Sequence, residues 1–250
     1  MTLKSFANDW MPPALKRFIR PRRFGLFGDY PTWAAAQADS ATYDTDITAF
    51  DPIVREIRAG GGHMGELPNA VLTGAALGKK VNVLDFGGNL GMGYFRAVTT
   101  MPEIIETWHV VDLSPVVEYG SKNFSDQRLK FFTHIESATD KQKPDVVICD
   151  AVLSFMSEPY AALVDMAKTG ASIIVLDRTR MFLGDSEKIT VQQNYSNIGN
   201  DRRPFRVVSS NKVAASLSGY RLVAQKDHNA PDPGAEDAKY MAQVYLRTIA

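Results

Sequence analysis

The most constraining feature of the sequence is an apolar run, VNVLDF at residues 81–86, that leads directly into the glycine-rich stretch GGNLGMG at residues 87–93. Glycines let a backbone turn sharply and approach a ligand at the start of a helix. A second run, WHVVD, ends at Asp112 about 20 residues later, where an acidic side chain accepts hydrogen bonds from both hydroxyls of a ribose. Together they predict a nucleotide cofactor held by Asp85, Gly87, Gly88, Asn89, Gly91 and Asp112.

The details of this turn favour S-adenosylmethionine (SAM) over a dinucleotide. The dinucleotide fingerprint G-x-G-x-x-G has glycine at a position occupied here by Asn89. SAM has no phosphate but carries an ammonium group, which Asp85 can bind through the backbone or through water. A glycine turn with a purely steric role is the alternative.

Five short apolar runs alternate with helical patterns after residue 80: VNVLDF, WHVVDL, LKFF, DVVICD and SIIVLD. This alternation predicts a parallel sheet with crossover helices, one of them from Pro159 to Gly170. RLVAQ and MAQVYLRTI, separated by the loop NAPDPGAED, predict a closing antiparallel hairpin. We therefore expect an α/β, Rossmann-like class I methyltransferase fold, with a seven-stranded, mostly parallel sheet at 79–250. Residues 1–78 are rich in Pro and Gly breakers and predict an irregular helical cap without a strand of convincing length.

Composition narrows the class of partner. The 250 residues are 45% hydrophobic and carry 28 basic and 28 acidic side chains, a balance that disfavours nucleic acid as a partner. The single cysteine, Cys149, lies in an apolar run and is predicted to be a core residue. No signal peptide or transmembrane run is evident, so we expect a cytoplasmic protein. A basic segment at 16–23 could bind an anionic membrane surface or a phosphate-bearing substrate; the alternative is a solvated arm without a binding role.

Several segments carry a closer resemblance: FGDYPTWAAAQADSATYD, VLDFGGNLGMGYF, WHVVDLSPVVEYG, DVVICDAVLSFMSEPYAAL, and IIVLDRTRMF followed by TVQQ. Over nearly its whole length the chain resembles a bacterial family of presumptive SAM-dependent methyltransferases found among polysaccharide and lipopolysaccharide biosynthesis proteins. Asp112 stands where relatives often have Glu. The resemblance implies a SAM-binding fold and a setting in surface-glycan assembly, and it leaves the substrate open.

Catalytic candidates follow the strand ends, because ligands of open α/β sheets lie beyond the carboxyl ends of the strands. Asp150 and Asp177 occupy two such ends. Asp150 is either the base that takes the acceptor's proton or a residue that orders the SAM amino group. Arg178 directly after Asp177 disfavours a metal, since a cation stands where another oxygen ligand would help.

Other residues complete the predicted site. His134 is a base, an adenine neighbour or a loop residue; Leu113, Ile135 and Glu136 fall where related enzymes contact the cofactor. Arg178 binds an anionic acceptor or forms an ion pair with Asp177. Tyr30, Trp33, Gln192 and Tyr195 are candidate walls for a sugar, with core packing as the alternative for the aromatics.

The leading hypothesis is O-methylation of a sugar, nucleotide sugar or glycan-related small molecule. A catalytically silent SAM-binding partner or regulator is the alternative. A nicotinamide-linked sugar dehydrogenase is a third hypothesis, disfavoured because no Tyr-x-x-x-Lys pair follows the central strands. The methylated atom and the oligomeric state are left open.

Overall fold

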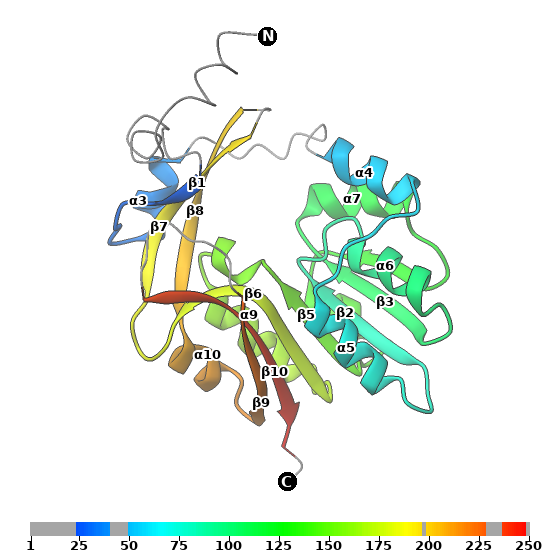
Figure 1. Ribbon diagram of the computed structural model, residues 1–250. Coiled ribbons are helices and arrows are strands. Elements are labelled where there is room, and N and C mark those ends of the chain that lie inside the picture. Colours follow the sequence, from blue (N-terminus) through cyan, green and yellow to red (C-terminus); the bar gives the residue numbers. More distant parts are fainter. Residues whose placement is uncertain (1–23, 41–49, 197–198, 229–236, 249–250) are drawn as a thin grey trace, which may run out of the picture.

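A computed structural model describes residues 24–40, 50–196, 199–228 and 237–248. Within these residues, ten strands join in one extended sheet (Figure 1). Its central part has the order β4-β3-β2-β5-β6-β10-β9. The strands are β4 (Leu129–Phe132), β3 (Ile105–Val111), β2 (Val81–Phe86), β5 (Val146–Asp150), β6 (Ile173–Phe182), β10 (Ala238–Arg247) and β9 (Tyr220–His228).

This strand order confirms the expected class I methyltransferase fold. Strands β4, β3, β2, β5 and β6 are parallel to their neighbours, whereas β10 is antiparallel to both β6 and β9. The chain order reverses direction between β2 and β5, which are adjacent in the sheet. Ligands of open α/β sheets bind at such a switch point, beyond the carboxyl ends of the strands. The glycine-rich turn after β2 lies there.

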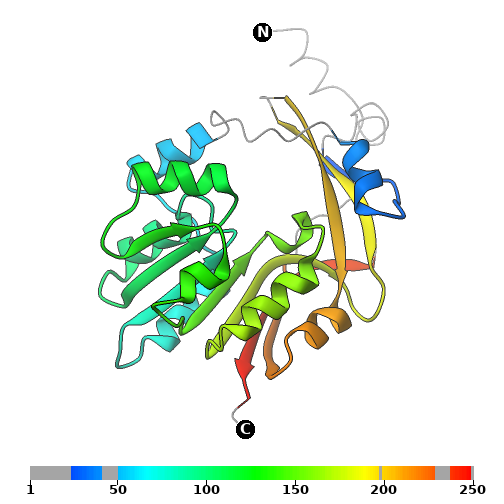
Figure 2. The ribbon, with the colours of Figure 1, turned by 180° about the vertical axis from the view of Figure 1, so that it is seen from behind.

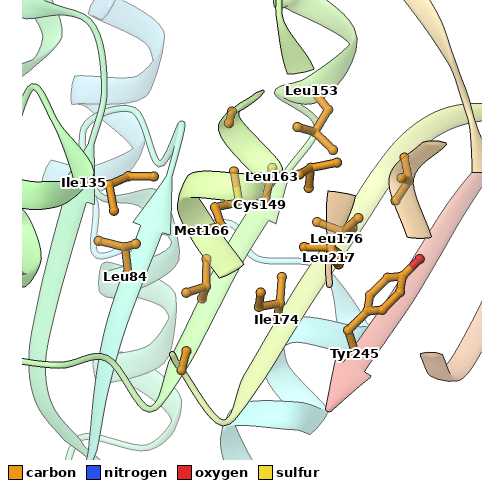
Figure 3. Close-up of a cluster of buried hydrophobic side chains, with 14 of the residues drawn as sticks. Leu84, Ile135, Cys149, Leu153, Leu163, Met166, Ile174, Leu176, Leu217 and Tyr245 are labelled. Atoms are coloured by element: carbon orange, nitrogen blue, oxygen red, sulfur yellow. The ribbon is translucent and has the colours of Figure 1, made fainter. Parts of the chain in front are cut away.

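Helices cover both faces of the central sheet. One core cluster packs side chains of α8 (Ile135–Thr139), α9 (Pro159–Lys168) and α10 (Ser210–Ser216) against one face (Figure 3). The opposite face packs against α5 (Glu66–Ala75) and α6 (Met92–Thr100), with Trp108 fully buried between them and the sheet. Cys149 is buried in the first cluster, and burial raises the pKa of its thiol well above the ordinary value. It is a core residue, as predicted.

Three additional strands form a small antiparallel sheet that the sequence did not predict. They are β1 (Phe24–Phe27), β7 (Lys188–Ser196) and β8 (Gly199–Ser209), and β8 joins the last residues of β6 in parallel. The predicted helical cap at residues 1–78 therefore contains a short strand. Only four residues long, β1 becomes a strand by pairing with β7, far away in sequence, which no local pattern reveals.

Apart from α5, the described part of the predicted cap is divided between two places. Strand β1 and α3 (Trp33–Ala38) pack on the small sheet, whereas α4 (Asp51–Arg58) packs beside α6 and α7 (Ser114–Asn123). The two groups stand on opposite sides of the carboxyl ends of the central strands (Figure 1), and Figure 2 shows the same arrangement from behind. The boundary at residue 78 stays a prediction, and the basic segment 16–23 lies outside the described residues. In the described part of the chain, no helix is long and apolar enough to cross a membrane.

Candidate functional site

The glycine-rich turn after β2 has the backbone geometry that its sequence predicts. Gly87 and Gly91 have left-handed φ angles of 73° and 83°, and Gly91 is the N-cap of α6. Asn89 also has a positive φ, 52°, which Asn tolerates better than most residues. Its side-chain oxygen accepts a hydrogen bond from the Leu90 backbone N–H at 2.8 Å. The turn thus leads directly into the N-terminus of a helix.

Asp85 lies directly beneath this turn. Its side chain is buried, and Oδ2 accepts a hydrogen bond from the Trp108 indole Nε1 at 3.0 Å. A Cβ added at Gly88 would come within 2.4 Å of the Asp85 carboxyl group, so only glycine permits this contact. Burial raises the pKa of Asp85 to about 7, with Asp150 and Asp112 contributing to the increase and the Trp108 hydrogen bond opposing it.

Asp112 holds the turn from the other side. One carboxylate oxygen accepts a hydrogen bond from the Asn89 backbone N–H at 2.9 Å, and the other accepts one from the Leu113 N–H at 2.7 Å. Burial raises the pKa of Asp112, and these two hydrogen bonds oppose that rise. Leu113 is 61% exposed, which is unusual for a leucine that directly follows a buried strand. It presents an apolar surface next to the turn.

The residues after β4 occupy different environments. His134 is the exposed N-cap of α8, and its Nδ1 lies 2.8 Å from the Thr133 hydroxyl. Ile135 is 8% exposed and packs into the core cluster with Ala138, whereas Glu136 is exposed. Their predicted roles toward the adenine stay predictions.

A pocket of about 220 Å³ opens beside the turn. The predicted residues that line it are Asp85, Gly87, Gly88, Asn89, Asp150 and Arg178. It is also lined by residues that we did not predict: Ile53, His63, Met64, Met92, Gly93, Trp108 and Ile148. The structure thus brings the glycine turn of β2 together with the end of β5 and with Arg178, which lies in the middle of β6 and not at the strand end that the sequence predicted.

Arg178 reaches the pocket because β6 contains a bulge. Thr179 pairs with Met241 and Leu176 pairs with Gln243, so Asp177 and Arg178 together stand opposite the single Ala242. Arg178 has a φ of 46°, strained for a residue with a Cβ. A bulge of this kind redirects a side chain, and it is common next to active sites.

The redirected guanidinium forms a bidentate ion pair with Asp150. Arg178 Nε donates to Asp150 Oδ1 at 2.6 Å and Nη2 donates to Oδ2 at 2.8 Å. Burial opposes the charge, but the hydrogen bonds and charge of Asp150 dominate and raise the pKa of Arg178. The predicted alternatives for Arg178 did not include this partner.

Asp177 has a buried position under the loop that precedes α5. It is completely buried, and its Oδ1 accepts a hydrogen bond from the Arg178 backbone N–H at 2.9 Å. A Cβ at Gly65 would come within 1.8 Å of Oδ2, so the loop is in direct contact with this carboxylate. Within the described residues, no group of three or more His, Cys, Asp or Glu side chains is arranged to hold a metal ion.

The loop at residues 61–65, sequence GGHMG, crosses the pocket; we call it the glycine strap. A Cβ at Gly62 would lie 2.4 Å from the Arg96 backbone nitrogen and 2.8 Å from the Met92 carbonyl oxygen. The His63 N–H donates to that same Met92 carbonyl at 3.2 Å. The strap is therefore in backbone contact with α6 at one end and with Asp177 at the other, and it carries His63 and Met64 to the pocket.

The two faces of the small sheet have different surroundings. Residues directly opposite each other on antiparallel strands point to the same face. The face with Arg202 and Arg206 is covered by α3: Arg202 pairs with Asp39 at 2.9 Å, and the Arg206 guanidinium lies 5.8 Å from the Trp33 ring centroid. The Tyr30 hydroxyl donates to the same Asp39. Tyr30 and Trp33 thus pack on the α3 side.

The other face carries Gln192 and Arg203, which are paired across β7 and β8. Phe205 on this face contacts Phe155 of the short helix η2 (Leu153–Phe155), with the ring centroids 5.2 Å apart. The Arg203 guanidinium lies 5.3 Å from the Phe155 ring. Since η2 closely follows Asp150, this face looks toward the strand ends that line the pocket. Tyr195 pairs with Asn200 in the same sheet, and its side chain lies outside the described part.

No protein-family model matches the chain, and no curated protein matches it in sequence. Among solved structures, the chain is similar to a SAM-dependent methyltransferase from Clostridium acetobutylicum, with 8% identity, coverage of 83% of this chain and 100% of that chain, and a TM-score of 0.48.

Two further solved structures are similar to a comparable degree. One is the Burkholderia thailandensis 1,6-didemethyltoxoflavin-N1-methyltransferase with bound 1,6-didemethyltoxoflavin and S-adenosylhomocysteine (15% identity; 92% of this chain and 98% of that chain; TM-score 0.47). The other is the [4+2]-cyclase SpnF (12% identity; 73% and 82%; TM-score 0.47). The fold assignment rests on this chain's own strand order.

Sequence reasoning missed the residues that the strap and α4 bring to the pocket. The run GGGHMG carried a signal for the strap, because three consecutive glycines before a histidine indicate close backbone packing beside an imidazole. Ile53 carried no comparable signal, since it is one apolar residue on the amphipathic helix α4.

Proposed function

We propose that the protein is a SAM-dependent methyltransferase that acts on a small-molecule acceptor. The observation that carries this proposal is the Asp85 carboxyl group directly beneath the glycine turn. In a dinucleotide site the pyrophosphate occupies this place, and its two negative charges would be repelled by a carboxylate in a partly dehydrated pocket. A cationic ligand is attracted there instead.

The charges of the whole pocket support the same choice. Its lining contains two carboxylates, Asp85 and Asp150, and one guanidinium, Arg178. With Asp85 ionised, the pocket carries an excess of one negative charge. SAM carries a sulfonium and an ammonium against one carboxylate, so its net charge complements that of the pocket.

Each chemical part of SAM has a candidate partner. When bound, SAM supplies an electrophilic methyl group on its sulfonium sulfur. Asp85 accepts hydrogen bonds from the ammonium directly or through water, and Asp112 accepts hydrogen bonds from the ribose hydroxyls with lone pairs that its two backbone partners leave open. Leu113 offers its exposed apolar surface to the adenine.

For the acceptor we propose a glycan-related small molecule, such as a nucleotide sugar, bound between the pocket and the small sheet. Phe155 provides a ring surface, Gln192 a hydrogen-bonding amide and Arg203 a positive charge on the face that looks toward the pocket. A ring surface suits the apolar side of a sugar, and a guanidinium suits a phosphate. The resemblance to polysaccharide biosynthesis proteins supports this class of acceptor. Tyr30 and Trp33 pack on the opposite face of the small sheet, so we do not place them against the acceptor.

One observation favours the alternative, a SAM-binding protein without transferase activity. Asp150, the predicted base, has both carboxylate oxygens engaged by Arg178. The guanidinium of Arg178 therefore occupies the oxygens that a base would use. Incubation with methyl-labelled SAM and a cell-envelope extract distinguishes the two functions, because cofactor binding with no transfer of label would support the silent protein.

The first test of the proposal is isothermal titration of the purified protein with SAM, S-adenosylhomocysteine and NAD. We expect micromolar binding of the first two and none of NAD. Binding of NAD alone would overturn the proposal, since it would show that the Asp85 carboxyl group tolerates a pyrophosphate.

A further inference from the structure

The glycine strap carries an imidazole to the pocket, and the sequence did not predict a role for it. Four ionisable side chains line the pocket within the described residues: Asp85, Asp150, Arg178 and His63. Asp85 lies on the floor and accepts the Trp108 N–H, and Asp150 and Arg178 form a bidentate pair. His63 lines the pocket and is exposed, so it is accessible to water.

The position of His63 is determined by backbone packing on both sides. Its own N–H donates to Met92, the first residue of α6, and Gly62 lies too close to α6 for any larger residue. On the other side, Gly65 touches the Asp177 carboxylate. Two close contacts of this kind leave the strap little freedom to move, and they hold His63 at the pocket. A surface loop without function has no need of this precision.

We propose that His63 takes the proton from the acceptor hydroxyl during methyl transfer, an inference that rests on the proposed function. In this step the acceptor oxygen forms a bond to the methyl carbon, while the bond from that carbon to sulfur breaks and leaves its electron pair on sulfur. The hydroxyl proton moves to an imidazole nitrogen of His63. Because His63 is exposed, the proton then passes to water. Asp150 has the separate role of positioning Arg178.

The inference makes a prediction that needs no acceptor. If His63 lies beside the reacting methyl group, the sulfonium charge of SAM disfavours the protonated imidazole, whereas neutral S-adenosylhomocysteine has no such effect. At pH 6.5 a free imidazole is about half protonated. We expect SAM to lower the ratio of protonated to neutral His63 roughly 3- to 10-fold relative to S-adenosylhomocysteine, the effect of a unit charge some 6 Å away in a partly hydrated site.

The measurement is NMR of the full chain with isotope-labelled histidine, titrated with SAM and separately with S-adenosylhomocysteine. The chain contains four histidines, so the spectrum is simple, and the His63→Gln variant assigns the signal of interest. His134 is an internal control, because it caps α8 outside the pocket and should respond equally to both ligands. Calorimetry on His63→Gln should show SAM affinity within about 3-fold of the wild type.

The possible results separate the two proposals. A response of His63 to SAM that exceeds its response to S-adenosylhomocysteine supports the inference. Equal responses of His63 to two bound ligands would overturn it and leave the proposed function intact, as would a large loss of SAM affinity in His63→Gln, which would make His63 a cofactor ligand. If calorimetry on the wild-type protein detects binding of neither ligand, the proposed function fails, and the inference fails with it.

Discussion

Replacing Asp85 by asparagine should stabilise the ligand-free protein while it impairs cofactor binding. Asparagine has nearly the same shape and keeps an oxygen that accepts the Trp108 N–H. It has no charge, however, and burial disfavours the charged form of Asp85 so strongly that its pKa rises from 3.8 to about 7. The variant therefore removes a buried charge that the folded protein must otherwise carry at neutral pH.

The magnitude follows from the difference between the two pKa values. Because the folded protein holds the Asp85 proton more tightly than the unfolded chain, the stability from this residue is fully present below about pH 4. It declines as the pH rises to about 7 and is constant above that. A difference of about three in pKa corresponds to about 4 kcal/mol. The asparagine side chain resembles the neutral form of Asp85 at every pH, so the gain of the variant should be about 2 kcal/mol at pH 5 and about 4 kcal/mol at pH 8.

Urea denaturation at pH 5, 6, 7 and 8 measures this pH dependence directly. The matched control is Asp145→Asn, which should have the opposite sign. Burial acts to raise the pKa of Asp145, but hydrogen bonds from Lys79 and Asn82 dominate and lower it, so this carboxylate stabilises the fold at neutral pH. A gain for Asp85→Asn that is equal at all four pH values, or absent, would refute the assignment of a costly buried charge beneath the turn.

Four other outcomes are expected. SAM should bind roughly 10-fold more tightly at pH 8 than at pH 6, because its ammonium requires ionised Asp85, and calorimetry showing no such increase would contradict this pairing. Asp112→Ala should weaken SAM binding by roughly 1 to 3 kcal/mol through loss of charge-assisted hydrogen bonds; unchanged affinity with an intact fold would exclude Asp112 from the ribose site. Arg178→Ala should lower the free energy of unfolding by about 1 to 2 kcal/mol. The same replacement should cost much less in an Asp150→Asn background, because the half-exposed ion pair between the two side chains is then already lost. Gly62→Ala should cost about 1 to 3 kcal/mol, because the added methyl meets the backbone of α6; thermal unfolding at the wild-type temperature would show that the strap can move aside.

The central fold and the cofactor turn were predictable because their signals are local. The parallel strands of the central sheet contain short apolar runs, and the turn after β2 requires glycines where the backbone has left-handed φ angles. The position of Asp112 followed from the spacing of consecutive strands. Their carboxyl ends meet at one edge of a parallel sheet, so residues at those ends are neighbours in any such fold.

The pairing of Asp150 with Arg178 was not predictable, because it depends on the bulge in β6. A shift by one residue turns a side chain from one face of a strand to the other. Without the bulge, the side chain of Arg178 would therefore point to the opposite face of β6. The alternation of apolar residues in IIVLDRTRMF does not show where an extra residue is accommodated. The sequence predicted that the strand ends at Asp177, whereas β6 continues to Phe182, so Arg178 lies in the middle of the strand and the partner strand β10 determined its orientation.

The sequence by itself determined where the central parallel strands lie along the chain, the turn beneath which Asp85 lies and the acidic residue at the end of β3, because each depends on hydrophobic periodicity or on the conformational freedom of glycine within a few residues. Only the tertiary structure decided that β1 and β7 form a second sheet, that Arg178 engages Asp150 and that the glycine strap places His63 at the pocket. These features arise from contacts between segments far apart in the chain, and their free energy depends on packing that no single segment encodes.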